Sequence, residues 1–191
     1  MTATGCGYLL DMDDLLELYE RSSEWAESKV DGAAEHLDDP TTCDGWDVRT
    51  LLNHVIATQH YFAASARGEE AAPPTGTPPD ALSDDVVADF AAARAEVIRA
   101  FNGPGVIDKT GPLLGIAFSD LLLHGWDVAA STEQDATMPA SLASAAYEMI
   151  HGRFTDEQRN GVFKPEVPVT DGASAQDRLL AYTGRSPAAG S

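Results

Sequence analysis

The stretch SDLLLHGWDVAAS, residues 119–131, carries two carboxylates and one imidazole within an otherwise apolar run. At about 100° per residue, His124 lies about 40° around a helix from Asp120, and Asp127 lies about 20° from it on the other side. The three side chains therefore share one narrow stripe. The remaining faces are also apolar, which is typical of a buried helix. A divalent metal ion removes the cost of burying a carboxylate, because it binds carboxylate and neutral imidazole together.

A second predicted helix, over residues 47–66, supplies a candidate third ligand. His54 shares one helical face with Leu51, and we expect this face to point into a helical bundle. His54 from one helix, with Asp120 and His124 from another, would give three protein ligands. Three ligands and one open position are the pattern of a catalytic metal site rather than a structural one.

The same residues have simpler interpretations. A histidine on an apolar face can be a satisfied core residue, and an Asp and a His one turn apart can hydrogen-bond each other. Asp127 has three open roles: an acceptor that orients a ligand histidine, a general base, or the partner of the Trp46 indole or of Arg49. The other histidines lie off these stripes, and we expect them at the surface: His36, His60 and His151.

The composition limits the partners of the protein. The 191 residues carry a formal net charge of -19, which argues against nucleic acid and against an anionic membrane surface, because both require Lys and Arg. No run approaches the ~20 apolar residues that span a bilayer, and the start lacks the segments of a signal peptide. The two cysteines, Cys6 and Cys43, form no CxxC pair for a thiolate zinc site. We expect a soluble, cytoplasmic protein.

Apolar periodicity predicts the helices that position these side chains. They cover residues 11–30, 47–66, 84–102, about 112–131, 139–154 and 174–183, with a Pro- and Gly-rich loop over 68–85. Ser174 and Asp177 predict a capping box. The pattern indicates an all-α fold in one domain over residues 1–191, with a helical bundle over about 13–153. A C-terminal appendage over 154–191 would hold a short extended piece and a helix.

Three segments resemble one known family. TTCDGWDVRTLLNHVIATQHYF resembles the opening motif of the mycothiol-dependent maleylpyruvate isomerase-like proteins, a Cys-x-x-Trp-x-Val-x-x-Leu-x-x-His run. SDLLLHGWDVAAST resembles their second motif, an acidic residue four positions before a histidine, followed by Trp-Asp. FKPEVPV and DRLLAYTGRSP are similar to the tail of an actinobacterial branch. The resemblance covers residues 13–187.

The resemblance implies a DinB-like four-helix bundle with a divalent metal ion, often zinc, at one end of its core. The family's ligand positions correspond to His54, Asp120 and His124, although the characterised isomerases have Glu where this chain has Asp120. The metal would bind a low-molecular-weight thiol such as mycothiol, and the thiolate would attack a small electrophilic substrate. Asp127 would be catalytic, orienting a ligand or moving a proton. No cysteine of the chain is expected to be the nucleophile.

The alternative function is non-catalytic. The protein would then bind a metal or a small ligand on the same scaffold without catalysing a reaction. Coordination distinguishes the two functions. Three protein ligands and a solvent favour an enzyme, whereas a fourth protein ligand favours a binding role. A homodimer that pairs through helix faces is also an expectation for this group.

Overall fold

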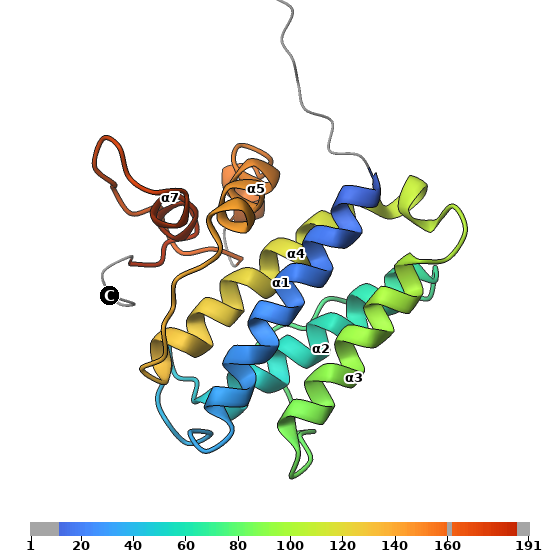
Figure 1. Cartoon of the computed structure of the whole chain (residues 1–191), viewed down its shortest axis with the longest axis horizontal. Helices are drawn as coiled ribbons and strands as arrows, with labels where there is room; N and C mark the ends of the chain where they lie inside the picture. The colour runs from blue at the N-terminus through green and yellow to red at the C-terminus, as the bar shows by residue number, and fades with distance from the viewer. Residues whose placement is uncertain (1–11, 160–161, 187–191) are drawn as a thin grey trace, which may run out of the picture.

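Four long helices form a bundle in the computed structural model, which describes residues 12–159 and 162–186 (Figure 1). They are α1 (Met12–Ala33), α2 (Val48–Ala66), α3 (Val86–Phe101) and α4 (Val106–Ser131). Helix α1 packs along α3 and α4, and α2 packs along the same two helices. The predicted all-α bundle is therefore confirmed. Cys6 and the ends of the predicted 1–191 domain lie outside the described residues.

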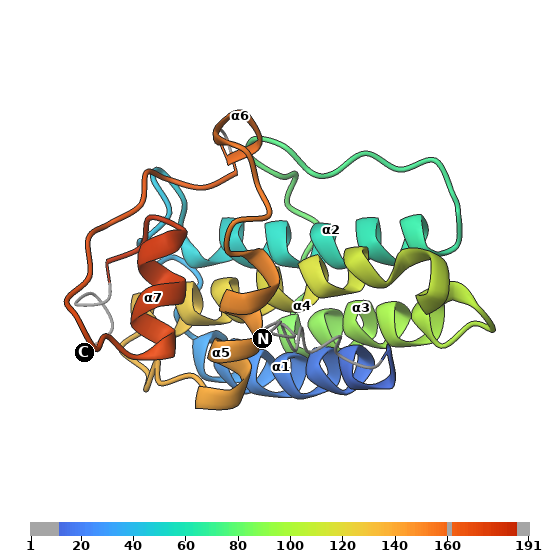
Figure 2. The ribbon, with the colours of Figure 1, turned by 90° about the horizontal axis from the view of Figure 1, so that it is seen from above.

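The helices α1 and α4 run in one direction, and α2 and α3 run in the other (Figure 1). Because α2 and α3 are parallel, the chain must return along the bundle between them. Residues 67–85 make this return as a long irregular connection (Figure 2). The antiparallel arrangement of α2 and α4 brings the first half of α2 beside the second half of α4. These are the halves that carry the predicted ligands.

Helix α4 is the central element of the core. Of its 26 residues, 14 are buried, and each fully buried Leu or Phe side chain contributes ~1.5–3 kcal/mol. By length and composition alone this helix could cross a membrane, but 72% of the apolar window is buried inside the protein. Its apolar faces therefore pack against the other helices of the bundle. This packing holds the charged stripe of α4 in place.

The start of α4 differs from the predicted start near Pro112. The helix begins at Val106, directly after Gly105, whose φ is 68°. Glycine adopts this left-handed conformation without the steric cost that a Cβ brings, so the chain turns sharply into the helix. Pro112 lies inside the helix and removes one backbone hydrogen bond. Apolar packing on both sides of α4 offsets that loss.

The C-terminal part packs against the bundle through α5 (Figure 2). It contains α5 (Ala140–Ile150), α6 (Asp156–Arg159) and α7 (Ala175–Tyr182). Helix α5 contacts α4, and α7 packs against α5. The predicted capping box of Ser174 and Asp177 is present at the start of α7. The sequence pattern did not predict α6, and it placed the end of α5 four residues too late.

The predicted extended piece over residues 161–169 forms no regular strand in the part of the chain that the structure describes. Within residues 162–169, the Val167 N–H donates to the Ala181 carbonyl at the end of α7 at 3.0 Å. With no neighbouring strand to pair with, this backbone N–H is satisfied by a helix end.

Candidate metal centre

His124 lies between two carboxylates of its own helix. Its Nδ1 is 3.0 Å from Asp127 Oδ2, and its Nε2 is 3.5 Å from Asp120 Oδ1. An ionised carboxylate only accepts hydrogen bonds, so the short contact assigns the proton to Nδ1. Nε2 then presents its lone pair toward Asp120. Metal-binding histidines commonly have this arrangement, with a carboxylate behind the ring and the free nitrogen on the metal.

The spacing between Asp120 and His124 fits a metal ion. Two ligands at ~2.0–2.1 Å from a tetrahedral zinc ion lie roughly 3.3 Å apart, close to the 3.5 Å between Oδ1 and Nε2. Asp120 Oδ2 is buried and accepts no hydrogen bond from the residues that the structure describes. This carboxylate is therefore available as a ligand.

His54 approaches the same position from α2. Its ring centre is 5.1 Å from that of His124, with the two rings at 80°. The Trp46 ring packs against His54, with the ring centres 5.0 Å apart. Burial, together with the neighbouring His124, lowers the pKa of His54 to about 4. The imidazole is therefore neutral at neutral pH, as a metal ligand must be.

The described residues also leave the buried Nδ1 of His54 without a hydrogen-bond partner. A buried polar atom without a partner costs about 1–3 kcal/mol. His54 and Asp120 thus both contain an unpartnered buried atom beside His124. The structure places His54 and Asp120 each beside His124, and a donor set of two nitrogens and one carboxylate suits zinc.

Asp127 is 1% exposed, and four donors surround its two oxygens. Oδ1 accepts from Thr42 Oγ1 at 3.0 Å and from Arg185 Nε at 2.9 Å. Oδ2 accepts from Arg185 Nη2 at 2.6 Å and from His124 Nδ1 at 3.0 Å. Burial alone would raise the pKa of Asp127, but the Arg185 guanidinium and the His124 hydrogen bond hold it well below its usual range.

The four hydrogen bonds distinguish among the roles considered for Asp127. It orients His124, whereas Arg49 pairs with Asp80 at 3.5 Å instead. With both oxygens fully used, Asp127 offers no lone pair to a metal or to a substrate proton. The geometry therefore favours a role in positioning His124 over a role in moving a proton.

Sequence reasoning did not identify Arg185. It follows α7 and lies 58 residues from Asp127 along the chain. Gly184, with φ of 78°, carries the chain so close to Lys164 that a Cβ at this position would collide with the lysine. A buried Asp on an apolar helix signals that some cation must pair with it. The sequence contains 12 Lys and Arg residues, and helical spacing does not select among them.

Cys43 lies beside the same cluster. Candidate ligand atoms of Cys43, His124 and Asp127 all lie within 4.8 Å of one another. Because hydrogen bonds saturate Asp127, only His124 and Cys43 of this group have free donor atoms. Burial and the Asp127 carboxylate raise the pKa of the Cys43 thiol to about 11, so the thiol is neutral and weakly nucleophilic at neutral pH.

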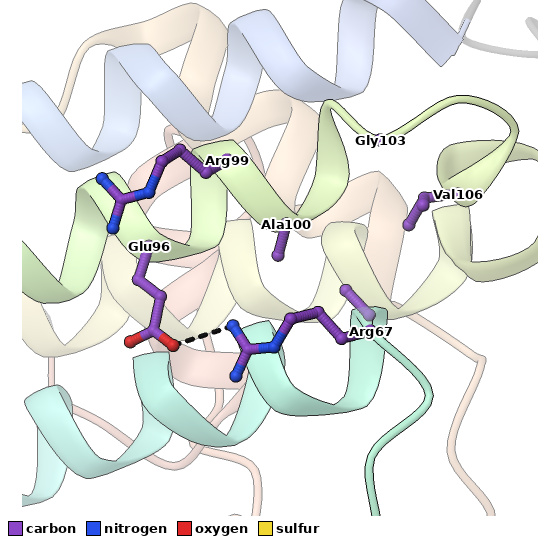
Figure 3. A pocket seen from close by; sticks show the side chains of 7 residues that line it. Arg67, Glu96, Arg99, Ala100, Gly103 and Val106 are labelled. Atoms are coloured by element: carbon purple, nitrogen blue, oxygen red, sulfur yellow. Dashed lines mark hydrogen bonds and ion pairs between the residues drawn. The ribbon is translucent and has the colours of Figure 1, made fainter.

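A larger pocket of about 570 Å³ lies at the opposite end of the bundle (Figure 3). Its lining residues are Ala66, Arg67, Glu96, Arg99, Ala100, Gly103 and Val106. Arg67 pairs there with Glu96 at 2.8 Å, and the predicted ligands are not among the lining residues. His124 also lines a void of only about 10 Å³, whose other walls are mainly apolar side chains. The core on this side of His124 is therefore tightly packed.

Comparison with known families agrees with this arrangement. Residues 22–129 match the family model described as mycothiol maleylpyruvate isomerase N-terminal domain. The match spans more than half of the chain. The chain belongs to this family. The family is mycothiol-related and DinB-like, with a metal-binding helical bundle. The matched range contains His54, Asp120, His124 and Asp127, whereas Arg185 lies beyond it.

Two similar curated proteins, both described as uncharacterized, come from Mycobacterium tuberculosis strains CDC 1551 / Oshkosh and ATCC 25618 / H37Rv. Each is 28% identical over 189 residues, which cover 92% of this chain and 99% of the relative. The similarity to these two proteins thus extends over nearly their whole length. No solved structure matches the chain.

Proposed function

We propose that this protein binds a divalent metal ion, zinc, through His54, Asp120 and His124, and uses it in thiol-dependent transfer or isomerisation of a small electrophile. The main support for this proposal is the set of contacts around His124. Asp127 holds one ring nitrogen, the other lies 3.5 Å from Asp120, and the His54 ring lies beside it. Membership of a mycothiol-related family supports the thiol-dependent part.

A bound zinc ion would lower the pKa of a low-molecular-weight thiol such as mycothiol and so supply a thiolate at neutral pH. The residues of the chain prepare that position. His54 offers a neutral imidazole, and Asp127 fixes the orientation of the His124 ring. Three protein ligands leave one coordination position open for the thiol.

One observation favours the second candidate, a non-catalytic metal-binding protein. Cys43 lies within 4.8 Å of a ligand atom of His124. As a fourth protein ligand, its thiolate would close the open position. The visible and near-ultraviolet spectrum of the Co²⁺-loaded protein separates the two candidates, because a cysteine ligand adds a thiolate-to-cobalt charge-transfer band. We expect no such band for an open site, and no change in the spectrum of Cys43→Ser.

The experiment for the enzyme proposal is metal analysis followed by a conjugation assay. The purified protein is expected to hold one zinc ion per chain and to conjugate mycothiol with at least one member of a panel of neutral and anionic electrophiles. His60→Ala is the matched control for His124→Ala, since His60 is exposed and faces α3. Equal turnover by wild type and His124→Ala would refute the proposal.

We further propose that the protein acts in the cytoplasm on small molecules, since its net charge of -19 opposes binding to nucleic acid and to anionic membranes. The expected homodimer is tested by light scattering, where a mass near twice that of one chain supports pairing.

A further inference from the structure

A buried hydrogen bond crosses the core next to the proposed metal centre. The Tyr19 hydroxyl, from α1, donates to Gln59 Oε1, from α2, at 2.6 Å. Both residues are 0% exposed. The amide nitrogen of Gln59 is buried too, and it has no hydrogen-bond partner within the described part of the chain. The core therefore contains an amide donor, Gln59 Nε2, which Tyr19 orients and which has no acceptor among the described residues.

Asp120 offers the matching acceptor. Its Oδ1 faces His124, whereas its buried Oδ2 accepts no hydrogen bond from any described residue. Because α2 and α4 are antiparallel, one turn back from His124 to Asp120 corresponds to about one turn forward from His54, near Gln59. Burial raises the pKa of Tyr19, and the Asp120 carboxylate adds to this rise. The charge of Asp120 thus acts on the layer that contains Tyr19 and Gln59.

We propose that Gln59 is a positioning residue of the metal centre. Its amide, oriented by Tyr19, holds Oδ2 of Asp120 through one bridging water molecule. A buried water needs two to four polar partners, and the Gln59 amide and Asp120 Oδ2 supply two. Left alone, each of these groups would cost about 1–3 kcal/mol. The inference rests on the proposed metal site and extends it across the core to α1.

This link gives Asp120 the same kind of support that Asp127 gives His124. A carboxylate that binds zinc through one oxygen can still rotate about its side-chain bonds. A hydrogen bond to its second oxygen restricts that rotation and keeps the ligand in place. Loss of such supporting partners typically weakens metal affinity by 10–100-fold.

The test compares two buried amides of α2. The double variant Tyr19→Phe/Gln59→Leu removes the donor and its orienting hydroxyl together, so it leaves neither of the two with an unpaired polar group. Asn53→Leu is the matched control. Asn53 is 5% exposed, and its amide bonds the Arg49 carbonyl and Asp80 rather than the metal centre.

Zinc affinity is measured by competition with a chromophoric chelator, and the Co²⁺ form is measured by visible absorption. We expect the double variant to stay folded, to bind zinc roughly 10–100-fold more weakly, and to have an altered cobalt spectrum. The control is expected to lose stability and keep its zinc affinity. Tyr19→Phe alone, which frees the amide to rotate and leaves Gln59 Oε1 without its donor, should show a smaller loss of affinity in the same direction.

The possible results separate this inference from the proposed function. Unchanged zinc affinity and an unchanged cobalt spectrum in the double variant overturn the inference and leave the metal proposal intact. An equal loss of affinity in Asn53→Leu also overturns it, since the effect would then reflect general weakening of the core. A wild-type protein that binds no zinc refutes the proposed function, and the inference with it.

Discussion

His54 and His60 lie six residues apart on α2 but have very different surroundings. His54 is partly buried against α4, and its Nδ1 has no hydrogen-bond partner among the described residues. The His60 side chain is 55% exposed, and its Nδ1 lies 2.6 Å from Glu96 Oε2 on α3. Arg67 also binds Glu96, at 2.8 Å (Figure 3). Each region therefore contains a histidine beside carboxylates.

The difference between the regions lies in how their polar atoms are satisfied. Around His60, Glu96 pairs with both His60 and Arg67 near the surface, and exposed pairs of this kind contribute only ~0–1 kcal/mol. Around His54, burial leaves atoms of His54 and Asp120 without partners. Such an arrangement is unfavourable in the isolated chain, and the metal ion that we propose would offset its cost. The unpartnered groups therefore favour the His54 region, rather than the His60 region, as the place of the proposed function.

The largest expected effect is on metal content. His54→Ala and His124→Ala should each abolish stoichiometric zinc binding, because each removes one of three ligands, whereas His60→Ala should retain one zinc ion per chain. Inductively coupled plasma mass spectrometry of the purified variants measures this. Circular dichroism provides the folding control. Full zinc content in either ligand variant would show that the assignment of ligands is wrong.

The second effect concerns two ion pairs. Arg185→Met should destabilise the protein by about 3–5 kcal/mol, because it leaves the buried Asp127 charge without its guanidinium. Arg67→Met should have a much smaller effect, because Arg67 and Glu69 lie at the surface. Urea unfolding measures both values. Similar losses in the two variants would mean that the two regions do not differ in the way we describe.

The third effect is stabilisation by the ligand. Zinc at 100 times its Kd should raise the free energy of unfolding by about 2.7 kcal/mol, since the ion binds the folded chain. A chelator should reverse this gain, and His124→Ala should show none of it. Thermal unfolding with and without zinc gives the result. A similar gain in His124→Ala would place zinc elsewhere on this acidic protein.

The smallest effect is a response to salt. Arg67 and Glu69 are exposed and Glu96 is partly exposed, so raising the salt concentration from 0.1 to 1 M should screen their pairs. A double-mutant cycle on Arg67 and Glu96 should give a small coupling energy that falls with salt. The coupling between Arg185 and Asp127 should be larger and less sensitive to salt, because Asp127 is buried.

The amino-acid sequence alone determined the local structure and the ligand faces. Helical periodicity gave the four bundle helices, and the Ser174 capping box gave the start of α7. The spacing of Asp120 and His124 placed both on one stripe, and the pattern around His54 placed it on an inward face. These inferences succeed because a helix fixes the direction of each side chain relative to neighbours only a few residues away.

Only the tertiary structure decided which distant residues complete the site. Arg185 reaches Asp127 from beyond α7, Thr42 reaches it from the loop before α2, and Tyr19 meets Gln59 across the core. Residues 40 to 85 positions apart in the chain are brought together by the path of the loops and the packing of the helices. No periodicity within one helix encodes that path. The sequence could show that Asp127 needs a partner, and the fold selected Arg185.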